Sequence, residues 1–336
     1  MIRSHTAGGS IERAEAAVSG LDTDKLNEMN DTARQYGMRS VLIVKDGRIA
    51  WEWHEQGTDR IGSVYSCTKS VLSALIGIAL DEGHIRSVDD RAAGYLKLQG
   101  SLEEHPVTIK QLLTMTPGYD WPDFDKPYKE MKKAEDWVQY VLDRPLVHTP
   151  GEVFTYNSGG SHLLSAVLTS ATGTSTLSYA REKLFGPLGI RRLKWGGQHG
   201  IQEGGAGLYL TAEDLAKLGM LFANQGVWEG NRLLSAGWIE ESTRSHSKGL
   251  VNYRPSIYGN YGYHWWVSAE QPEEVPPYYF AFGYGGQYMA VVPEYNAVVV
   301  LRKNLAGRNK ALLSRRILHE YIFSSLTGKT CNIIEG

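Results

Sequence analysis

The most distinctive feature of the hydropathy pattern is a run of apolar residues after position 70. From Val71 to Leu80 nearly every side chain is apolar, so the segment lacks the polar face of a surface helix. Such a run is typical of a helix buried inside a domain. It is too short, and too closely flanked by charge, to span a bilayer. We therefore expect a buried helix within residues 63–80.

Other helices are predicted where apolar residues recur at helical spacing or where a capping residue opens a segment. Residues 23–36 form one such segment, with Asp22 or Thr23 as its cap. A second begins at Thr211, whose capping box opens a helix through Phe222. Further helices are expected over residues 108–114, 134–142, 161–171, 176–184 and 306–323.

Strand-like segments lie near both ends of the chain. Residues 40–44 and 48–53 flank Lys45-Asp46-Gly47, and Asp-Gly between two β-rich runs is a strong hairpin signal. Late strands are expected over residues 263–267, 278–282, 287–292 and 297–302. This order of elements favours an α+β fold, an α/β sandwich in which both chain ends build one antiparallel sheet flanked by helices.

The same order predicts how the chain divides into domains. Residues 10–80 and 240–325 would form a discontinuous α/β domain around the sheet, and residues 81–239 a mainly helical domain inserted into it. A cleft between two such parts is a natural place for an active site.

Composition narrows the class of protein. The 336 residues are 42% hydrophobic and 21% charged, which is ordinary for a globular protein, and the net charge of −2 gives no reason to expect a nucleic-acid or membrane partner. Two cysteines, Cys67 and Cys331, cannot form a disulfide framework. The first residues lack an apolar signal core, so a cytoplasmic protein is expected. The nineteen tyrosines and nine tryptophans suggest a pocket lined by aromatic side chains.

Ser66 and Lys69 stand at the front of the apolar run. Three residues apart on a helix, they would share one face. A lysine at this position would be desolvated, which lowers its pKa and lets it act as a base toward a neighbouring hydroxyl. The same spacing also arises by chance: Ser245 and Lys248 match it in a segment predicted to be a loop.

Tyr156 is the candidate proton shuttle, because it lies in a loop that opens a predicted helix. A tyrosine near an ammonium group can have its pKa lowered and exchange protons with a serine hydroxyl. The alternative is a structural phenol, with Ser158 as a helix cap. Tyr258 is a competitor with a similar sequence around it.

A glycine-rich segment between two late strands is the third candidate, Ala281-Phe282-Gly283-Tyr284-Gly285-Gly286-Gln287. Glycine lets a strand approach a ligand closely. A backbone N–H on this edge, together with that of Ser66, could hold an oxyanion. The alternative is a plain hairpin or bulge.

In this order the three motifs resemble the serine β-lactamase and penicillin-binding-protein superfamily, most closely the branch of class C β-lactamases, EstB-like esterases and 6-aminohexanoate-dimer hydrolases. Ser66-Cys-Thr-Lys69 is similar to the Ser-x-x-Lys motif and Tyr156-Asn-Ser158 to the Tyr-x-Asn/Ser motif of that family. Ala281-Phe282-Gly283 falls where β-lactamases carry Lys-Thr-Gly. The resemblance runs from about residue 40 to residue 318 and implies a β-lactamase/transpeptidase-like fold.

The resemblance also implies roles for individual residues. Ser66 would be the nucleophile that becomes acylated, Lys69 and Tyr156 the base system, and the N–H of Tyr284 part of the oxyanion hole. The remaining substrate-site residues expected on this basis are Gly283, Phe282, Ser158, Tyr119 and Gln287. No metal and no other cofactor is expected.

The departures from the family pattern indicate the substrate. Ala281 and Phe282 stand where β-lactamases bind a carboxylate, and an apolar edge pairs poorly with that group. We therefore expect a serine hydrolase that cleaves a small carboxylic ester or amide, with weak or no β-lactamase activity. A D-amino-acid peptidase or β-lactamase, or a non-catalytic relative that binds a ligand in the same cleft, are the alternatives; the oligomeric state stays open.

The chain lacks the sequence motifs of other hydrolase and metalloenzyme classes. It has no Gly-x-Ser-x-Gly elbow of an α/β-hydrolase. His54-Glu55 and His319-Glu320 lack the second histidine of a zinc-binding helix.

Overall fold

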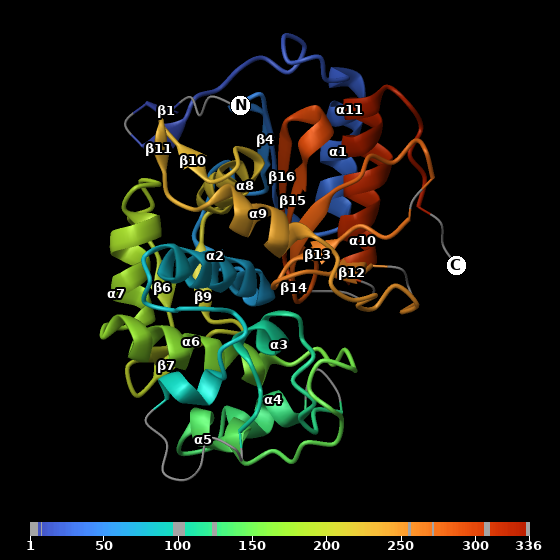
Figure 1. Ribbon diagram of the computed structural model, residues 1–336. Helices are drawn as coiled ribbons and strands as arrows, with labels where there is room; N and C mark the ends of the chain where they lie inside the picture. Colours follow the sequence, from blue (N-terminus) through green and yellow to red (C-terminus); the bar gives the residue numbers. More distant parts are fainter. Residues whose placement is uncertain are drawn as a thin grey trace.

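A seven-stranded antiparallel sheet joins the two ends of the chain (Figure 1). The computed structural model describes residues 6–7, 9–96, 105–122, 126–254, 257–270, 272–305 and 310–333. In spatial order the strands are β12 (Asn260–Tyr261), β13 (Trp266–Val267), β14 (Tyr279–Gly283), β15 (Gln287–Val292), β16 (Ala297–Lys303), β3 (Met38–Lys45) and β4 (Arg48–His54). The last strand therefore pairs with the first hairpin, and the predicted fold class is confirmed.

The hairpin between β3 and β4 turns at Asp46 and Gly47, as predicted. Both residues have positive φ angles, 50° and 82°. This is the backbone of a two-residue turn whose twist matches that of the flanking strands. Lys45 pairs with Arg48 at the end of the ladder.

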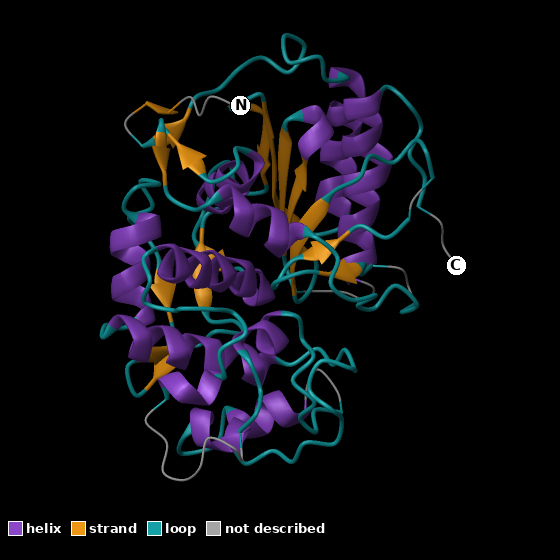
Figure 2. Ribbon diagram, viewed as in Figure 1, coloured by secondary structure: helices purple, strands orange, loops and turns teal. Residues whose placement is uncertain are grey.

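Helices cover both faces of the sheet (Figures 1 and 2). One face is covered by α1 (Thr23–Gln35), α10 (Lys310–Arg316), its π-helical continuation η6 (Ile317–Phe323) and α11 (Ser324–Thr327). The other face is covered by α8 (Ala212–Ala223) and α2 (Thr68–Asp81). The predicted closing helix thus continues to Thr327, and its first four residues, 306–309, lie outside the described part of the chain.

The buried helix predicted around Ser66 is α2, preceded by a 3₁₀ turn, η1 (Tyr65–Cys67). Every residue of α2 from Thr68 to Ala79 is buried, because the helix lies between the sheet and the helical part of the chain (Figure 1). A Cβ atom added to Gly77 would lie 2.6 Å from the Trp238 ring of α9 (Ala236–Thr243), so this helix packs closely there.

The middle of the chain is mostly helical. It contains α3 (Ile109–Leu113), α4 (Lys126–Met131), α5 (Trp137–Leu142), α6 (Ser158–Thr172), α7 (Thr176–Ala180) and the π-helical η4 (Arg181–Phe185). Helix α6 packs against α2, α3 and α5 and is central to this part. Helix α8 also lies within residues 81–239 but packs on β16 and β15, and the division into two domains at residues 81 and 239 stays a prediction.

The predicted strand over residues 263–267 is wrong in its first half. His264 has a φ angle of 58°, which breaks the extended backbone. The chain turns there, so that β12 and β13 pair across the break.

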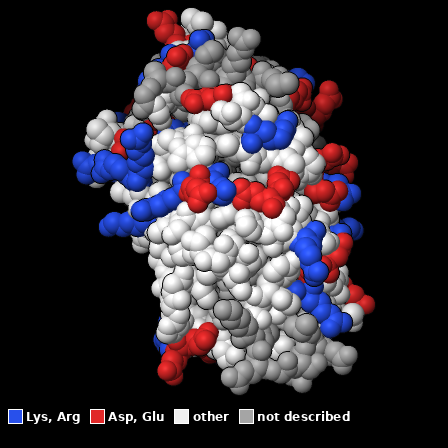
Figure 3. Space-filling model, turned by 60° about the vertical axis from the view of Figure 1, so that its left-hand side comes forward, with Lys and Arg blue, Asp and Glu red and all other residues white. Residues whose placement is uncertain are grey.

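The molecular surface in Figure 3 carries charges of both signs. Lys and Arg alternate with Asp and Glu in a belt across the middle, and a broad uncharged region lies below it. Within the described part of the chain, every helix is too short or too polar to cross a bilayer.

Candidate active site

Ser66 lies in η1, one residue before the end of this 3₁₀ turn, and its side chain is partly exposed. The preceding Tyr65 has a φ angle of 47°, an unfavourable conformation that persists only where the surroundings fix it. The hydroxyl of Thr68 donates to the Tyr65 carbonyl oxygen over 2.6 Å and helps to hold the turn. Ser66 is therefore presented in the turn before α2. The sequence had suggested that it lies on the helix together with Lys69, and that part of the prediction is wrong.

Lys69 lies in the first turn of α2 with only 1% of its surface exposed. Its Nζ atom lies 3.1 Å from Ser66 Oγ, 3.1 Å from Ser158 Oγ and 2.7 Å from the carbonyl oxygen of Gly205. The predicted Ser66–Lys69 pair is thus in direct contact. The competing pair behaves differently, because Ser245 and Lys248 lie in a loop, as expected.

Burial lowers the pKa of Lys69 to about 7, as predicted. Near neutral pH a large part of the protein therefore has a neutral amine here. The Gly205 carbonyl can only accept, so it takes one N–H of that amine. One N–H and the lone pair then remain for the two serine hydroxyls, and the lone pair can receive the proton of Ser66.

Tyr156 is also placed at Ser66: the two side chains are hydrogen-bonded. The expected lowering of its pKa is wrong, since burial raises the pKa of Tyr156 well above its ordinary value. Lys69 Nζ lies over the ring, 4.8 Å from its centroid. The phenol consequently keeps its proton at neutral pH and is suited to act as an acid.

Asn157 caps α6, with its side-chain oxygen accepting from the Gly160 N–H over 2.9 Å. The alternative role of Ser158 as the cap is therefore wrong, and its hydroxyl contacts Lys69 instead. The two neighbouring residues of the motif therefore have different roles: Asn157 caps the helix, and Ser158 contacts the Lys69 amine.

The glycine-rich segment lies beside η1. A Cβ atom added to Gly283 would lie 2.4 Å from the Val64 carbonyl oxygen, so the end of β14 reaches the turn that holds Ser66. Tyr284 follows directly, is 61% exposed, and its ring lies 5.8 Å from that of Tyr65. Phe282 is buried and packs against the Tyr258 ring, at 5.4 Å between centroids.

Gln287 requires a correction. Its side chain is 1% exposed and hydrogen-bonds the backbone N–H and C=O of Lys303 at 3.1 and 2.9 Å. A buried amide with these partners supports the pairing of β15 with β16 and is not accessible to a substrate. The sequence could not separate the two roles, because both require a polar residue after a glycine-rich turn.

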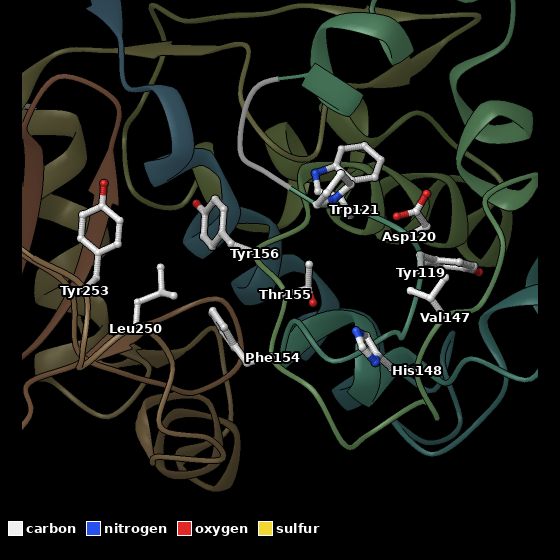
Figure 4. Close-up of a pocket in the computed structure, with 11 residues that line it drawn as sticks. Tyr119, Asp120, Trp121, Val147, His148, Phe154, Thr155, Tyr156, Leu250 and Tyr253 are labelled. Carbon is white, nitrogen blue, oxygen red and sulfur yellow. The ribbon is translucent and has the colours of Figure 1, made fainter.

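A pocket of about 460 Å³ opens beside Tyr156 (Figure 4). In Figure 4 one wall comes from Tyr119 and its neighbours and the other from Leu250 and Tyr253. The lining residues are Tyr119, Asp120, Trp121, Pro122, Val147, His148, Phe154, Thr155, Tyr156, Leu250 and Tyr253. Tyr119 thus lines the pocket as expected.

Gly205 was missed by the sequence analysis. Its carbonyl oxygen is the nearest of the three Lys69 partners, and it lies in the segment from Glu203 to Gly207. The only signal for it was the Gly204-Gly205 pair, which marks a close backbone approach.

Among the described residues, no group of three or more His, Cys, Asp and Glu side chains is arranged to hold a metal ion.

Comparison with known proteins identifies the family and the fold. The family model named Beta-lactamase matches residues 24–321. The 6-aminohexanoate-dimer hydrolase of Paenarthrobacter ureafaciens is 23% identical over 284 residues, which cover 77% of this chain and 70% of the relative.

Two solved structures share the fold. The octameric penicillin-binding protein homologue from Pyrococcus abyssi aligns with a TM-score of 0.68 and 20% identity, over 92% of this chain and 78% of the other. EstCE1, described as a hydrolase with promiscuous acyltransferase activity, aligns with a TM-score of 0.69 and 16% identity, over 88% and 98% of the two chains. Because the family model spans most of the sequence, this chain belongs to the Beta-lactamase family of hydrolases.

Proposed function

We propose that this protein is a serine hydrolase that forms an acyl-enzyme on Ser66 and cleaves small carboxylic esters or amides. The observation that carries the proposal is the contact between Ser66 Oγ and Lys69 Nζ, 3.1 Å apart, with the pKa of Lys69 near 7. A nucleophilic hydroxyl needs a base of this kind within hydrogen-bond reach.

In the acylation step, Ser66 Oγ attacks the substrate carbonyl carbon and gives its proton to Lys69. The N–H groups of Ser66 and Tyr284 stabilise the tetrahedral oxyanion. The bond to the leaving alcohol or amine then breaks, and that group takes the proton of Tyr156. The raised pKa of Tyr156 supports this order, because the phenol is protonated when the substrate arrives.

In the deacylation step, the Tyr156 phenolate takes a proton from a water molecule, whose oxygen attacks the acyl carbon. The ester bond to Ser66 breaks, and the serine recovers its proton from the Lys69 ammonium. The product acid leaves, and each residue has its starting proton again.

The pocket supports a neutral, apolar group in the substrate. Most of its lining side chains are aromatic or aliphatic. The carboxylate of Asp120 is paired with Arg144 at 2.7 Å, which offsets its charge. Ala281, at the position of the carboxylate-binding lysine of β-lactamases, is buried and uncharged. We therefore propose weak or no β-lactamase activity.

The test is labelling with a fluorophosphonate probe and turnover of short-chain p-nitrophenyl esters, with S66A as the control. We expect both in the unchanged protein and neither in S66A. A panel with D-amino-acid amides, the 6-aminohexanoate dimer and nitrocefin then ranks the substrate classes. If neither the unchanged protein nor S66A shows label or turnover, the protein is a non-catalytic relative. If label and turnover persist in S66A, Ser66 is not the nucleophile; if nitrocefin is the best substrate, the assignment of a neutral substrate is overturned.

A further inference from the structure

We propose that Glu203 is a positioning residue of this site: it holds the segment that presents the Gly205 carbonyl to Lys69, and its negative charge acts on the Lys69 amine. The inference rests on the proposed function, since it concerns the base that activates Ser66. Glu203 is a charged side chain with only 4% of its surface exposed, and the reaction steps above do not use it.

The backbone around Glu203 is fixed on both sides. Its N–H donates to the Gly196 carbonyl over 2.8 Å, and its own carbonyl accepts from Trp195 Nε1 over 2.9 Å. At the other end of the segment, the Gly207 carbonyl accepts from the Gly196 N–H over 3.0 Å. Residues 203–207 therefore form a short loop whose two ends are both hydrogen-bonded to the backbone of Gly196.

The carboxylate of Glu203 fixes the segment from a third direction. It pairs with Lys132 Nζ at 2.6 Å and accepts a hydrogen bond from the Tyr128 hydroxyl. Lys132 is itself held over the Trp137 ring, 3.8 Å from its centroid. The loop is thus tied to α4 and to the turn that follows this helix.

Two glycines let the loop lie directly on the start of α6. A Cβ atom added to Gly204 would lie 2.0 Å from the Ser161 carbonyl oxygen, and one added to Gly205 would lie 2.8 Å from the Cβ of Ser158. The Gly205 carbonyl consequently points at Lys69 Nζ from a position set by Glu203, two residues away.

The groups in contact with Lys69 are neutral, so the charge of Glu203, which the Lys132 ammonium group offsets only in part, acts on the amine. Cys67 from η1 has a pKa raised to about 12 by burial, and Tyr156 has a raised pKa as well. His264 lies with Nδ1 3.3 Å from the Lys69 carbonyl oxygen, and burial lowers its pKa to about 3. Ser66 and Ser158 carry hydroxyl groups, which are uncharged at this pH. Among the described groups that act on the amine near neutral pH, Glu203 supplies the negative charge, and it raises the pKa of Lys69 against the effect of burial.

The test is the rate of fluorophosphonate labelling of Ser66 as a function of pH. In the unchanged protein the rate should rise with a midpoint near pH 7, where Lys69 loses its proton. E203Q keeps the shape but removes the charge and replaces one acceptor oxygen by an NH2 donor. The amide oxygen can still accept from Lys132 Nζ, and the amide N–H can donate to the Tyr128 hydroxyl oxygen. The midpoint should therefore fall by about 0.5 pH or more. A residue with a purely structural role would change the rate without moving the midpoint.

The chain offers a matched control. Glu82 pairs with Lys183 at 2.8 Å and accepts from the Tyr179 hydroxyl at 2.8 Å, which is the same arrangement of side chains away from Lys69. E82Q should leave the midpoint in place. If E203Q does not fold, the double variant E203Q/K132M, which removes both charges of the buried pair, should show a smaller fall, because loss of the Lys132 cation partly offsets loss of the Glu203 anion.

The outcomes separate the two proposals. Labelling with an unchanged midpoint in E203Q, or in the double variant, overturns the role of Glu203 and leaves the serine hydrolase standing. An equal fall in E82Q also overturns it, because the effect would then be one of net charge. Absence of Ser66 labelling in the unchanged protein overturns the proposed function and this inference with it.

Discussion

The ring of Trp266 stacks on the ring of Tyr156, with centroids 5.7 Å apart and planes inclined by 16°. Trp266 belongs to β13 and is itself enclosed by the rings of Tyr258 and Tyr261, at 4.8 and 4.6 Å. Tyr156 comes from the loop before α6, in the helical part of the chain. The sheet therefore supports its phenol, while the start of α6 fixes its backbone.

Replacing Tyr156 by phenylalanine removes the hydroxyl and keeps the stacked ring. We expect kcat/KM for ester hydrolysis to fall by about a hundredfold or more, the scale of a positioned acid–base group. The melting temperature should change little, because the ring contact with Trp266 remains. Steady-state kinetics and thermal melts check the two parts. A Y156F enzyme with unchanged turnover would show that another phenol, with Tyr258 the nearest candidate, carries the proton.

The acylation rate should rise with pH and then stay level, without a fall at alkaline pH up to about pH 10. If the neutral amine is the base, as proposed, the rate should rise through about pH 7 as Lys69 loses its proton. Tyr156 must keep its proton to act as the acid, and its pKa lies above the ordinary value of 10. The labelling rate should therefore stay level from about pH 8 to pH 10. A decline within that range would mean that Tyr156 titrates earlier than its burial implies.

Lys69 should make the protein less stable at low pH. In the unfolded chain its pKa is the ordinary 10.5, and in the folded protein it is about 7. Between these values only the unfolded chain binds the proton, so stability rises with pH across this window. Below pH 7 both states bind it, and the folded state carries the whole cost of a buried ammonium group.

K69M removes that cost. We expect the free energy of unfolding at pH 6 to rise by on the order of a few kcal/mol, and its increase between pH 7 and 10 to become smaller. Urea unfolding at several pH values measures both effects. The S66A variant is the control, because it keeps the amine. Equal pH dependence in K69M and S66A would show that Lys69 is not the source.

Local patterns predicted the elements that later hold the site. The apolar run after Val71 gave α2, and Asp46-Gly47 gave the first hairpin, because each depends on neighbouring residues. The motif residues Ser66, Lys69 and Tyr156 do meet, as the resemblance implied. These features are set within a few residues of sequence or within a family motif.

Features that arise from distant parts of the chain were missed. The pKa of Tyr156 was assigned the wrong direction, because Trp266 and Tyr261 bury the phenol from more than a hundred residues away. Gly205 carries no side chain, and only the fold brings its carbonyl to Lys69. For the same reason the sequence pattern could not predict that the Gln287 amide is hydrogen-bonded to the backbone of Lys303.

The packing of α8 on the sheet gives a test of the fold itself. Gly219 faces β16, and a Cβ atom there would lie 2.5 Å from Val298 Cγ1. Alanine favours helices over glycine, yet G219A should lower the free energy of unfolding by about 1–3 kcal/mol, because the central strand cannot move away. Gly237 in α9 has nothing within 4 Å of the same position, so G237A should instead raise it by about 0.4–1 kcal/mol. Urea unfolding of both variants decides the matter: equal stability would mean that α8 does not approach the sheet as closely as described.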